Sequence, residues 1–205
     1  MTTTKDTIID ASIDLIMQKG ATATSLNAIC QATGLTKGAF FHYFKSKDDL
    51  IKQSILRFSL KMQQSLSSLR SDLALSAQER LWEFFDNYLL LPEHSKFNGC
   101  VIGICAQELA YSNTDLQALI GQAFAPTVIE LSNLISEVAR EKSLSVDSES
   151  LARFWLVSFQ GALLVFRGIG NQLILREATV HYRNYLFNIL QIKDEQSGVS
   201  HRMLD

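Results

Sequence analysis

The 205-residue sequence contains little that would interrupt helices, since it has only two prolines and ten glycines. Alanine, leucine, serine, glutamine and isoleucine are abundant, and such a composition favours helix over sheet. Apolar residues recur with helical periodicity along most of the chain, and no segment has the alternation of a strand. We therefore expect an all-α protein of about nine helices.

A strong charge of one sign is also missing, because 19 Lys and Arg residues oppose 21 Asp and Glu residues. Residues 1–50 are balanced as well, with five lysines against five aspartates. This balance excludes a general basic field that would attract nucleic acid. Any contact with DNA must therefore depend on where individual lysines are placed.

Patterns of catalytic and metal-binding residues are absent too. The four histidines are widely spaced, no HExxH or GxSxG motif occurs, and no glycine-rich loop follows a strand. Cys100 and Cys105 lie five positions apart, a helical spacing that suits neither a disulfide nor a shared tetrahedral ion. We expect no enzymatic activity, no cofactor and no metal site.

Signal peptides and long apolar runs are missing as well. No segment approaches the length of about 20 apolar residues that spans a bilayer. The three cysteines do not form an even set, which is typical of a reducing compartment. We expect a soluble, cytoplasmic protein without a membrane partner.

The most informative stretch runs from Thr24 to Lys47. Thr24, followed by Asn27, predicts a helix start with a hydroxyl that caps the first turn. Gly34 predicts the end of that helix, because a positive φ costs glycine least. A second short helix follows over 35–44. The stretch therefore predicts a helix-turn-helix, whose second helix fits the major groove of DNA.

The spacing separates an inner face of this helix pair from an outer one. The inner positions are apolar or small, as packing of the two helices requires: Ile29, Cys30, Leu35, Phe40 and Tyr43. The outer positions are the predicted DNA contacts, and Thr36 and Lys37 are the nearest to base edges. The full predicted DNA-binding set is Thr24, Ser25, Thr36, Lys37, Gly38, Ala39, Phe41, His42, Tyr43 and Lys47.

The run from Gly34 to Lys47, GLTKGAFFHYFKSK, followed by Asp49 and Leu50, resembles the signature of the TetR (tetracycline-repressor-like) family of one-component bacterial repressors. The resemblance covers roughly residues 5–58. It implies a helix-turn-helix DNA-binding domain over 1–46 and a helical effector-binding and dimerisation domain over 47–205. It also implies a homodimer on a palindromic double-stranded DNA operator.

One position departs from the family pattern. Family members usually carry a tyrosine where this chain has Phe41, and the hydroxyl of that tyrosine usually binds a DNA phosphate. Phe41 keeps the ring and lacks the donor. We expect Tyr43, His42 and Lys47 to contact the DNA backbone instead.

The remainder of the chain predicts a helical bundle. A long helix begins at Lys47, a nearly all-apolar central helix follows over 99–111, and Pro126 is expected to bend or break the helix after it. The apolar stretches 151–166 and 182–190 exceed what one neighbouring helix pair covers. We expect them to form the homodimer interface.

Aromatic residues in this second part are typical of a core, and we expect several of them to line a cavity for a drug-like or metabolite effector. A carboxylate in an apolar helix needs a partner, and Arg167 or a ligand are the candidates for Glu108. The predicted effector contacts are Phe85, Tyr88, Cys100, Glu108, Trp155 and Phe159.

Gly99 and Cys100, with Glu108 further on, are similar to the start of the central helix in a family subgroup, some members of which respond to electrophiles or oxidants through cysteine. In the first turn of a helix, free N–H groups would lower the pKa of the Cys100 thiol. Cys105 lacks that help and is predicted to be inert. Alternatively, Cys100 only packs and the effector binds without a covalent bond.

Together these features predict a ligand-responsive transcriptional regulator that acts as a repressor. Its release from DNA would follow the binding of a small molecule or the reaction with an electrophile. The alternative is an all-α small-molecule binding or scaffolding protein without DNA activity.

Overall fold

The computed structural model describes residues 3–91 and 99–193. Within them nine α-helices and one short 3-10 helix form and no strand does, so the predicted all-α class is confirmed. From the sequence, Pro92 is expected to end a helix, residues 93–98 to form a polar loop and residues 194–205 to form a frayed tail. All three segments lie outside the described residues. The elements, in order, are α1 (Thr4–Lys19), α2 (Leu26–Thr33), α3 (Lys37–Tyr43), α4 (Lys47–Arg70), α5 (Ala77–Leu90), α6 (Val101–Leu109), η2 (Ala110–Ser112), α7 (Thr114–Glu141), α8 (Ser148–Ile169) and α9 (Leu173–Ile189).

The helix ends follow local signals in the sequence. Ser76 and Glu79 form a capping box at the start of α5, and the Asp147 carboxylate accepts the Ser150 N–H at 2.9 Å to start α8. Gly34 and Gly170 end α2 and α8 in the left-handed conformation, with φ of 68° and 71°. The end of α2 at Gly34 confirms the sequence-based prediction.

The chain packs as two compact units. The first unit comprises Met1–Ser68 with Lys96–Thr127, and the second comprises Leu69–Ser95 with Val128–Asp205. By packing, the first unit therefore reaches well beyond the segment 1–46 that was expected to form the DNA-binding domain.

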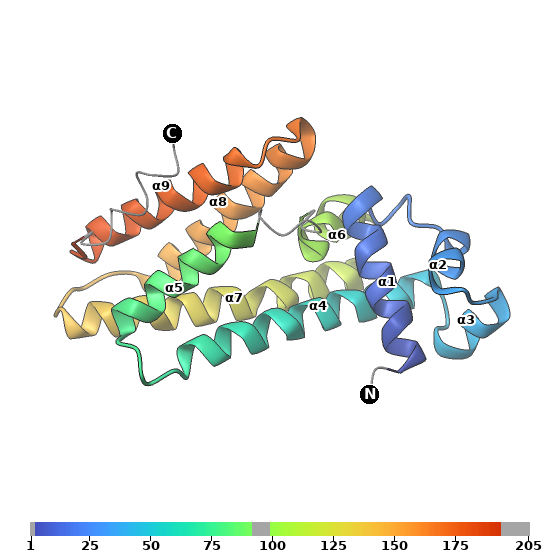
Figure 1. Ribbon diagram of the computed structural model, residues 1–205, viewed down its shortest axis with the longest axis horizontal. Helices are drawn as coiled ribbons and strands as arrows, with labels where there is room; N and C mark the ends of the chain where they lie inside the picture. The colour runs from blue at the N-terminus through green and yellow to red at the C-terminus, as the bar shows by residue number, and fades with distance from the viewer. Residues whose placement is uncertain (1–2, 92–98, 194–205) are drawn as a thin grey trace. The chain divides into compact units, whose positions relative to one another are not determined.

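The first unit is built on an aliphatic core. Figure 1 shows α2 lying beside both α1 and α3, and α6 lying beside α1. Ile8, Ile16 and Ile55 are fully buried, and Phe40 and Phe44 of the α3 region are each 1% exposed. Burial of each such side chain stabilises the fold by about 1.5–3 kcal/mol. The short helices α2 and α3 are therefore anchored by their inner faces.

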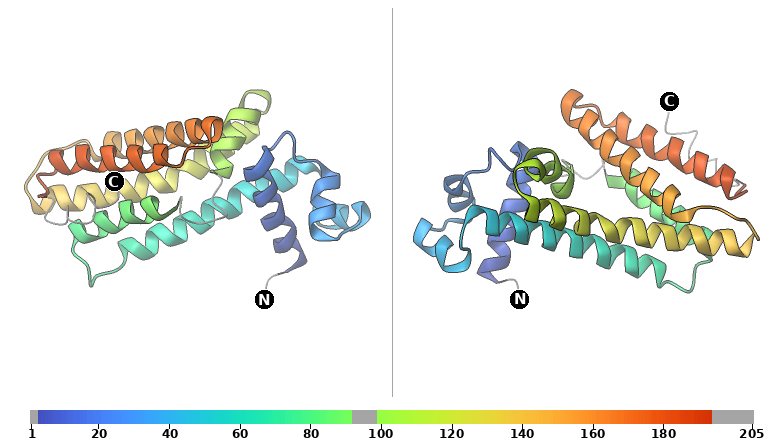
Figure 2. Two further views of the ribbon diagram at one scale, coloured as in Figure 1. Left: turned by 45° about the horizontal axis from the view of Figure 1, so that its top comes forward. Right: turned by 180° about the vertical axis from the view of Figure 1, so that it is seen from behind.

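Helix α4 runs parallel to the part of α7 in this unit, and Figure 2 shows the two side by side. Lys52 lies 3.9 Å from Asp115 in a long ion pair, and the Ser59 hydroxyl donates to the Ala123 carbonyl at 3.0 Å. This second bond lies three residues before Pro126, which has no N–H to donate to the helix. Of the bend or break that is predicted at Pro126, the break is wrong, because α7 continues through this residue from Thr114 to Glu141.

Among the described residues, α7 is also the one helix that is long and apolar enough, by length and composition only, to cross a membrane. The expectation that no segment is long and apolar enough to span a bilayer is therefore wrong for α7, by length and composition only. Leu116 and Ile120 of α7 are buried in the first unit, and Leu131 and Ile135 are buried in the second. These burials are those of a core helix.

The core of the second unit consists mainly of aromatic side chains instead. Helices α8 and α9 run antiparallel beside each other, and α5 packs on α9 (Figure 2). Trp155 of α8 is 1% exposed and Phe85 of α5 is fully buried. The Tyr182 hydroxyl of α9 donates to the Leu151 carbonyl of α8. This contact ties the far ends of the α8–α9 hairpin together.

Candidate nucleic-acid interface

Ser25, rather than Thr24, caps α2. The Ser25 hydroxyl accepts the Ala28 N–H at 3.2 Å. Thr24 is 1% exposed, and its hydroxyl donates to the Gly20 carbonyl at 2.7 Å inside the preceding loop. The predicted cap is therefore one residue off, and the buried Thr24 side chain supports the loop instead of facing DNA.

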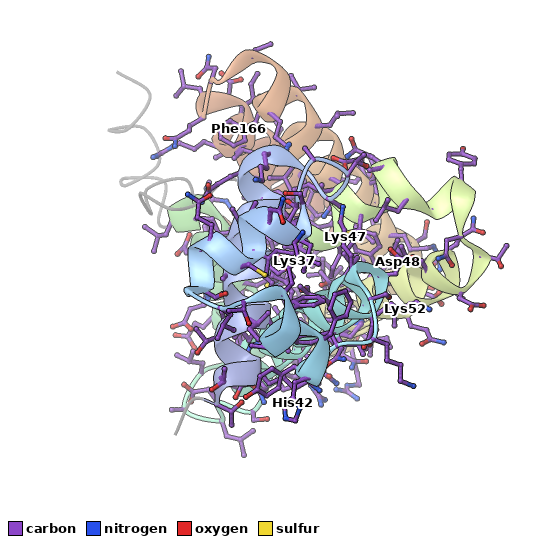
Figure 3. The ribbon with its side chains drawn as sticks, turned by 90° about the vertical axis from the view of Figure 1, so that its right-hand side faces the viewer. Lys37, His42, Lys47, Asp48, Lys52 and Phe166 are labelled. Atoms are coloured by element: carbon purple, nitrogen blue, oxygen red, sulfur yellow. The ribbon has the colours of Figure 1, made fainter. Side chains whose placement is uncertain are left out.

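Helix α3 presents the predicted reading residues on its outer face. Thr36 caps the helix by accepting the Ala39 N–H at 3.2 Å. Thr36, Lys37 and Gly38 are exposed and Ala39 is half-buried. Figure 3 looks onto this side of α3, with Lys37 and His42 labelled on the helix. The side chains that are predicted to reach base edges thus project from a helix whose inner face is anchored by Phe40.

The aromatic residues of α3 divide between the two faces. Phe41 is 54% exposed, and its ring meets the buried Phe40 ring edge-on at 5.3 Å. His42 is exposed, and Tyr43 is half-buried with its ring 5.1 Å from the imidazole. Phe41 therefore occupies an outward position without a hydrogen-bond donor, whereas the two residues that follow it, His42 and Tyr43, each carry one.

Lys47 at the start of α4 is engaged within the first unit. Its ammonium donates to the Thr22 carbonyl at 3.1 Å, and the residue is half-buried. Lys37, by contrast, is exposed, and it makes no ion pair among the described residues. Of these two predicted DNA contacts, Lys37 keeps its charge free for phosphate or base edges, whereas Lys47 already holds a carbonyl.

Helix α1 is clamped to α4 by Arg57. Its guanidinium donates to Asp10 through two bonds of 2.8 Å and to Asp6 at 2.7 Å, and Lys61 adds a contact of 2.9 Å to Asp10. The hydrogen bond from Arg57 lowers the pKa of Asp10 to about 2. These two aspartates therefore hold α1 against α4 in the first unit.

The predicted effector residues fall into two groups. Phe85, Tyr88, Trp155 and Phe159 lie together in the second unit. The Trp155 ring stacks on Phe159 at 5.1 Å and meets Phe85 and Tyr88 edge-on at 5.3 and 5.0 Å. The structure thus brings these four side chains into one buried aromatic cluster, built from α5 and α8.

The other group, Cys100, Glu108 and their neighbour Cys105, belongs to the first unit. Cys100 is the residue before α6 rather than in its first turn, and it is half-buried. Cys105 is fully buried, and burial raises the pKa of its thiol to about 12. Cys105 therefore stays protonated, as expected of an inert thiol. The Glu108 carboxylate is exposed and accepts the Thr22 N–H at 2.7 Å.

Sequence reasoning missed two residues. Thr22, in a short polar segment between helices, carries no motif that marks it as the partner of Lys47 and Glu108. Arg183 of α9 is 4% exposed, its guanidinium lies over the Trp82 ring at 4.8 Å, and one nitrogen is 3.5 Å from Asp86. Burial raises the pKa of Asp86, and the nearby Arg183 charge opposes that shift. A charged residue at an inward position of an amphipathic helix was the available signal for Arg183.

Comparisons with known proteins agree with this geometry. A family model described as "Bacterial regulatory proteins, tetR family" matches residues 8–53. The chain is 24% identical over 159 residues to the HTH-type transcriptional repressor DhaR of Mycobacterium sp. (strain GP1), covering 77% of this chain and 79% of that one.

Two solved structures share the fold. A TetR transcriptional regulator from Legionella pneumophila matches with a TM-score of 0.79 and 24% identity, over 90% of this chain and 98% of that one. The reduced form of NemR from E. coli matches with a TM-score of 0.76 and 20% identity, over 88% and 95%.

The anchored α2–α3 pair with its exposed outer face defines a helix-turn-helix DNA-binding transcriptional regulator. Together with the family match over that segment, it shows that the chain belongs to the TetR family of bacterial regulatory proteins.

Proposed function

We propose that the protein is a cytoplasmic, homodimeric repressor that binds a palindromic operator and leaves it when an effector binds. The exposed outer face of α3, from Thr36 to His42, carries the proposal. A helix held from behind by buried Phe40 and Phe44 can enter a major groove without losing its own packing. One such helix reads a half-site, so a palindrome needs two protomers.

The DNA-binding step is tested with the DNA upstream of the protein's own gene. In fluorescence anisotropy the protein should bind a fragment of this DNA much more tightly than a shuffled fragment of equal length and composition. A variant with Lys37→Ala and His42→Ala provides the matched control, because both side chains are exposed. Equal affinity for both fragments, unaffected by the double substitution, would favour the scaffolding alternative.

The dimer is proposed on the outer face of α8 and α9. Several large apolar side chains there are about half exposed or more in the single chain: Phe154, Val157, Leu164, Val165, Ile169, Leu173 and Tyr185. Such a set exceeds what a monomer normally leaves in water, and a two-fold axis would cover it with its own copy. Sedimentation at micromolar concentration should give a dimer, and Val157→Asp should give a monomer. A monomeric parent protein contradicts this interface.

The effector is proposed to bind among Phe85, Tyr88, Trp155 and Phe159. Their rings form an apolar wall suited to a drug-like or metabolite molecule of low polarity. Helix α7 contributes residues to both units, and α4 extends from Lys47 to Arg70. Binding would shift these long helices and change the separation of the two reading helices in the dimer.

A covalent route through Cys100 is the second candidate for the signal. The half-buried thiol lies next to the free N–H groups at the start of α6, while the other thiol of this helix region, Cys105, is buried and protonated. Treatment with a small electrophile while operator release is followed distinguishes the two routes. If Cys100→Ser protein is released as readily as the parent, the thiol route is wrong and the aromatic cluster remains.

A further inference from the structure

The loop between α1 and α2 is held by side chains from two other helices of the first unit. Glu108 near the end of α6 accepts the Thr22 N–H at 2.7 Å. Lys47 at the start of α4 donates to the Thr22 carbonyl at 3.1 Å. Both backbone polar groups of one exposed loop residue are therefore bonded to charged side chains, and such bonds are stronger than neutral ones.

The same loop leaves little room for another arrangement. Gly20 ends α1 with a φ of 92°, and a Cβ added there would come within 2.4 Å of a Glu108 carboxylate oxygen. Ala21 is fully buried, and the buried Thr24 hydroxyl donates to the Gly20 carbonyl at 2.7 Å. The Glu108 carboxylate thus lies directly against the Gly20 backbone as well as the Thr22 N–H.

We infer that Glu108 is a positioning residue for the DNA-reading helices. It acts through Thr22, three residues before the Ser25 cap of α2, and α2 in turn packs on α3. Loss of this bond would free the loop and let α2 and α3 depart from the arrangement that fits the operator. This inference rests on the proposed function and adds a residue of α6 to the parts that determine operator affinity.

The sign of the effect separates positioning from simple charge. An exposed carboxylate near DNA repels phosphate, so its removal would tighten binding if only charge mattered. Positioning through Thr22 predicts the reverse, because the bond is lost along with the charge. A variant that removes both the charge and the hydrogen bond should therefore bind operator more tightly if only charge matters, and more weakly if Glu108 positions the loop through Thr22.

The experiment compares Glu108→Ala, Glu108→Gln and the matched control Gln107→Ala, an exposed neighbour on the same helix. Affinities for operator and shuffled DNA are measured by fluorescence anisotropy on the full-length protein. Glu108→Ala should weaken operator binding about tenfold, within the usual range of coupling between sites, and leave shuffled DNA within about twofold of the parent. Glu108→Gln, whose amide oxygen can accept the Thr22 N–H, should recover part of the loss, and Gln107→Ala should match the parent.

Hydrogen exchange of the Thr22 amide, followed by NMR, provides a local readout on the same proteins. Exchange should be faster in Glu108→Ala than in the parent and intermediate in Glu108→Gln. Unchanged or tighter operator binding by Glu108→Ala overturns the inference, and so does an unchanged Thr22 exchange rate in either variant. If Glu108→Ala does not fold, the Glu108→Gln values decide by the same criteria. A parent protein that does not prefer operator DNA overturns the proposed function, and the inference with it.

Discussion

The two units of this chain are stabilised in different ways. The first has an aliphatic core, in which Arg57 holds α1 through the carboxylates of Asp6 and Asp10, and Lys47 holds the Thr22 carbonyl. The second has a core of aromatic side chains. The centroid of the Trp155 ring lies within 6.0 Å of the ring centroids of five other residues: Phe84, Phe85, Tyr88, Phe159 and Tyr182.

The difference fits the two tasks that we assign to the units. Hydrogen bonds are directional, so they fix the angle of a short helix that has to match DNA. Aromatic packing is strong but tolerates several ring arrangements, so it suits a wall that meets a ligand. Substitutions should therefore reduce stability most in the second unit and operator recognition most in the first.

The largest expected effect follows from Trp155→Ala. The indole is 1% exposed at the centre of the aromatic cluster, and its removal leaves a large cavity. The free energy of unfolding should fall by about 3–5 kcal/mol in chemical denaturation. Tyr111→Ala is the control, since that side chain is fully exposed and its loss should change stability by no more than about 0.5 kcal/mol. Equal effects would mean that the cluster does not dominate the second unit.

The second expectation contrasts two lysines of the first unit. Lys37→Ala removes a free charge, so the slope of log affinity against log salt should become about 0.9 smaller, without loss of folding. Lys47→Ala also removes the bond to the Thr22 carbonyl, so operator affinity should fall more than affinity for shuffled DNA. Titrations at four salt concentrations measure both. The contrast fails if the two variants have the same ratio of operator to shuffled-DNA affinity.

Helix ends and the reading face could be predicted because their signals are local. A serine or aspartate followed three residues later by a free N–H caps a helix wherever it lies, as Ser76 and Asp147 do. The outer face of α3 follows from helical periodicity once Phe40 is placed inward. The cap of α2 was predicted one residue too early, because Thr24 and Ser25 both carry a hydroxyl that can cap a helix. Only the packing of the folded chain, which buries Thr24, decides between them.

Partners distant in sequence could not be predicted. Glu108 and Thr22 are 86 residues apart, and no pattern in either segment points to the other. The apolar helix around Glu108 suggested a buried carboxylate that needs Arg167 or a ligand, yet the side chain lies at an exposed end of α6. Likewise, Pro126 predicted a bend or a break, and sequence alone does not show that α7 continues through it and has buried residues on both sides of it.

A smaller effect is expected from the clamp between α1 and α4. The folded-state pKa of Asp10 is lowered to about 2 from its ordinary value of 3.8, chiefly by the hydrogen bond from Arg57. A depressed carboxyl pKa contributes stability above pH 3.8 that is lost as the pH falls towards 2. Because more than a third of the Asp10 side chain is exposed, solvent screening limits the contribution to about 1 kcal/mol.

Denaturation of the parent and of Asp10→Asn between pH 6 and pH 2 measures this contribution. The parent should be the more stable protein at pH 6, and the two curves should converge towards pH 2. Asp14→Asn on the same helix controls for the change in net charge. A constant difference between parent and Asp10→Asn over the whole range would contradict an ionised Asp10 clamp.

The last expected effect, no larger than that of the clamp, concerns Phe41, which places a ring without a hydrogen-bond donor at an outward position of α3. Phe41→Tyr adds a hydroxyl to a ring that is 54% exposed, so the change should leave the Phe40 packing and the stability intact. If that position faces a DNA phosphate, the new hydrogen bond should tighten operator binding by about 1 kcal/mol, or roughly fivefold. The same gain should appear with shuffled DNA, because phosphate contacts carry no sequence information. Anisotropy with both fragments measures it, and an unchanged affinity would show that Tyr43 or His42 already contacts that phosphate.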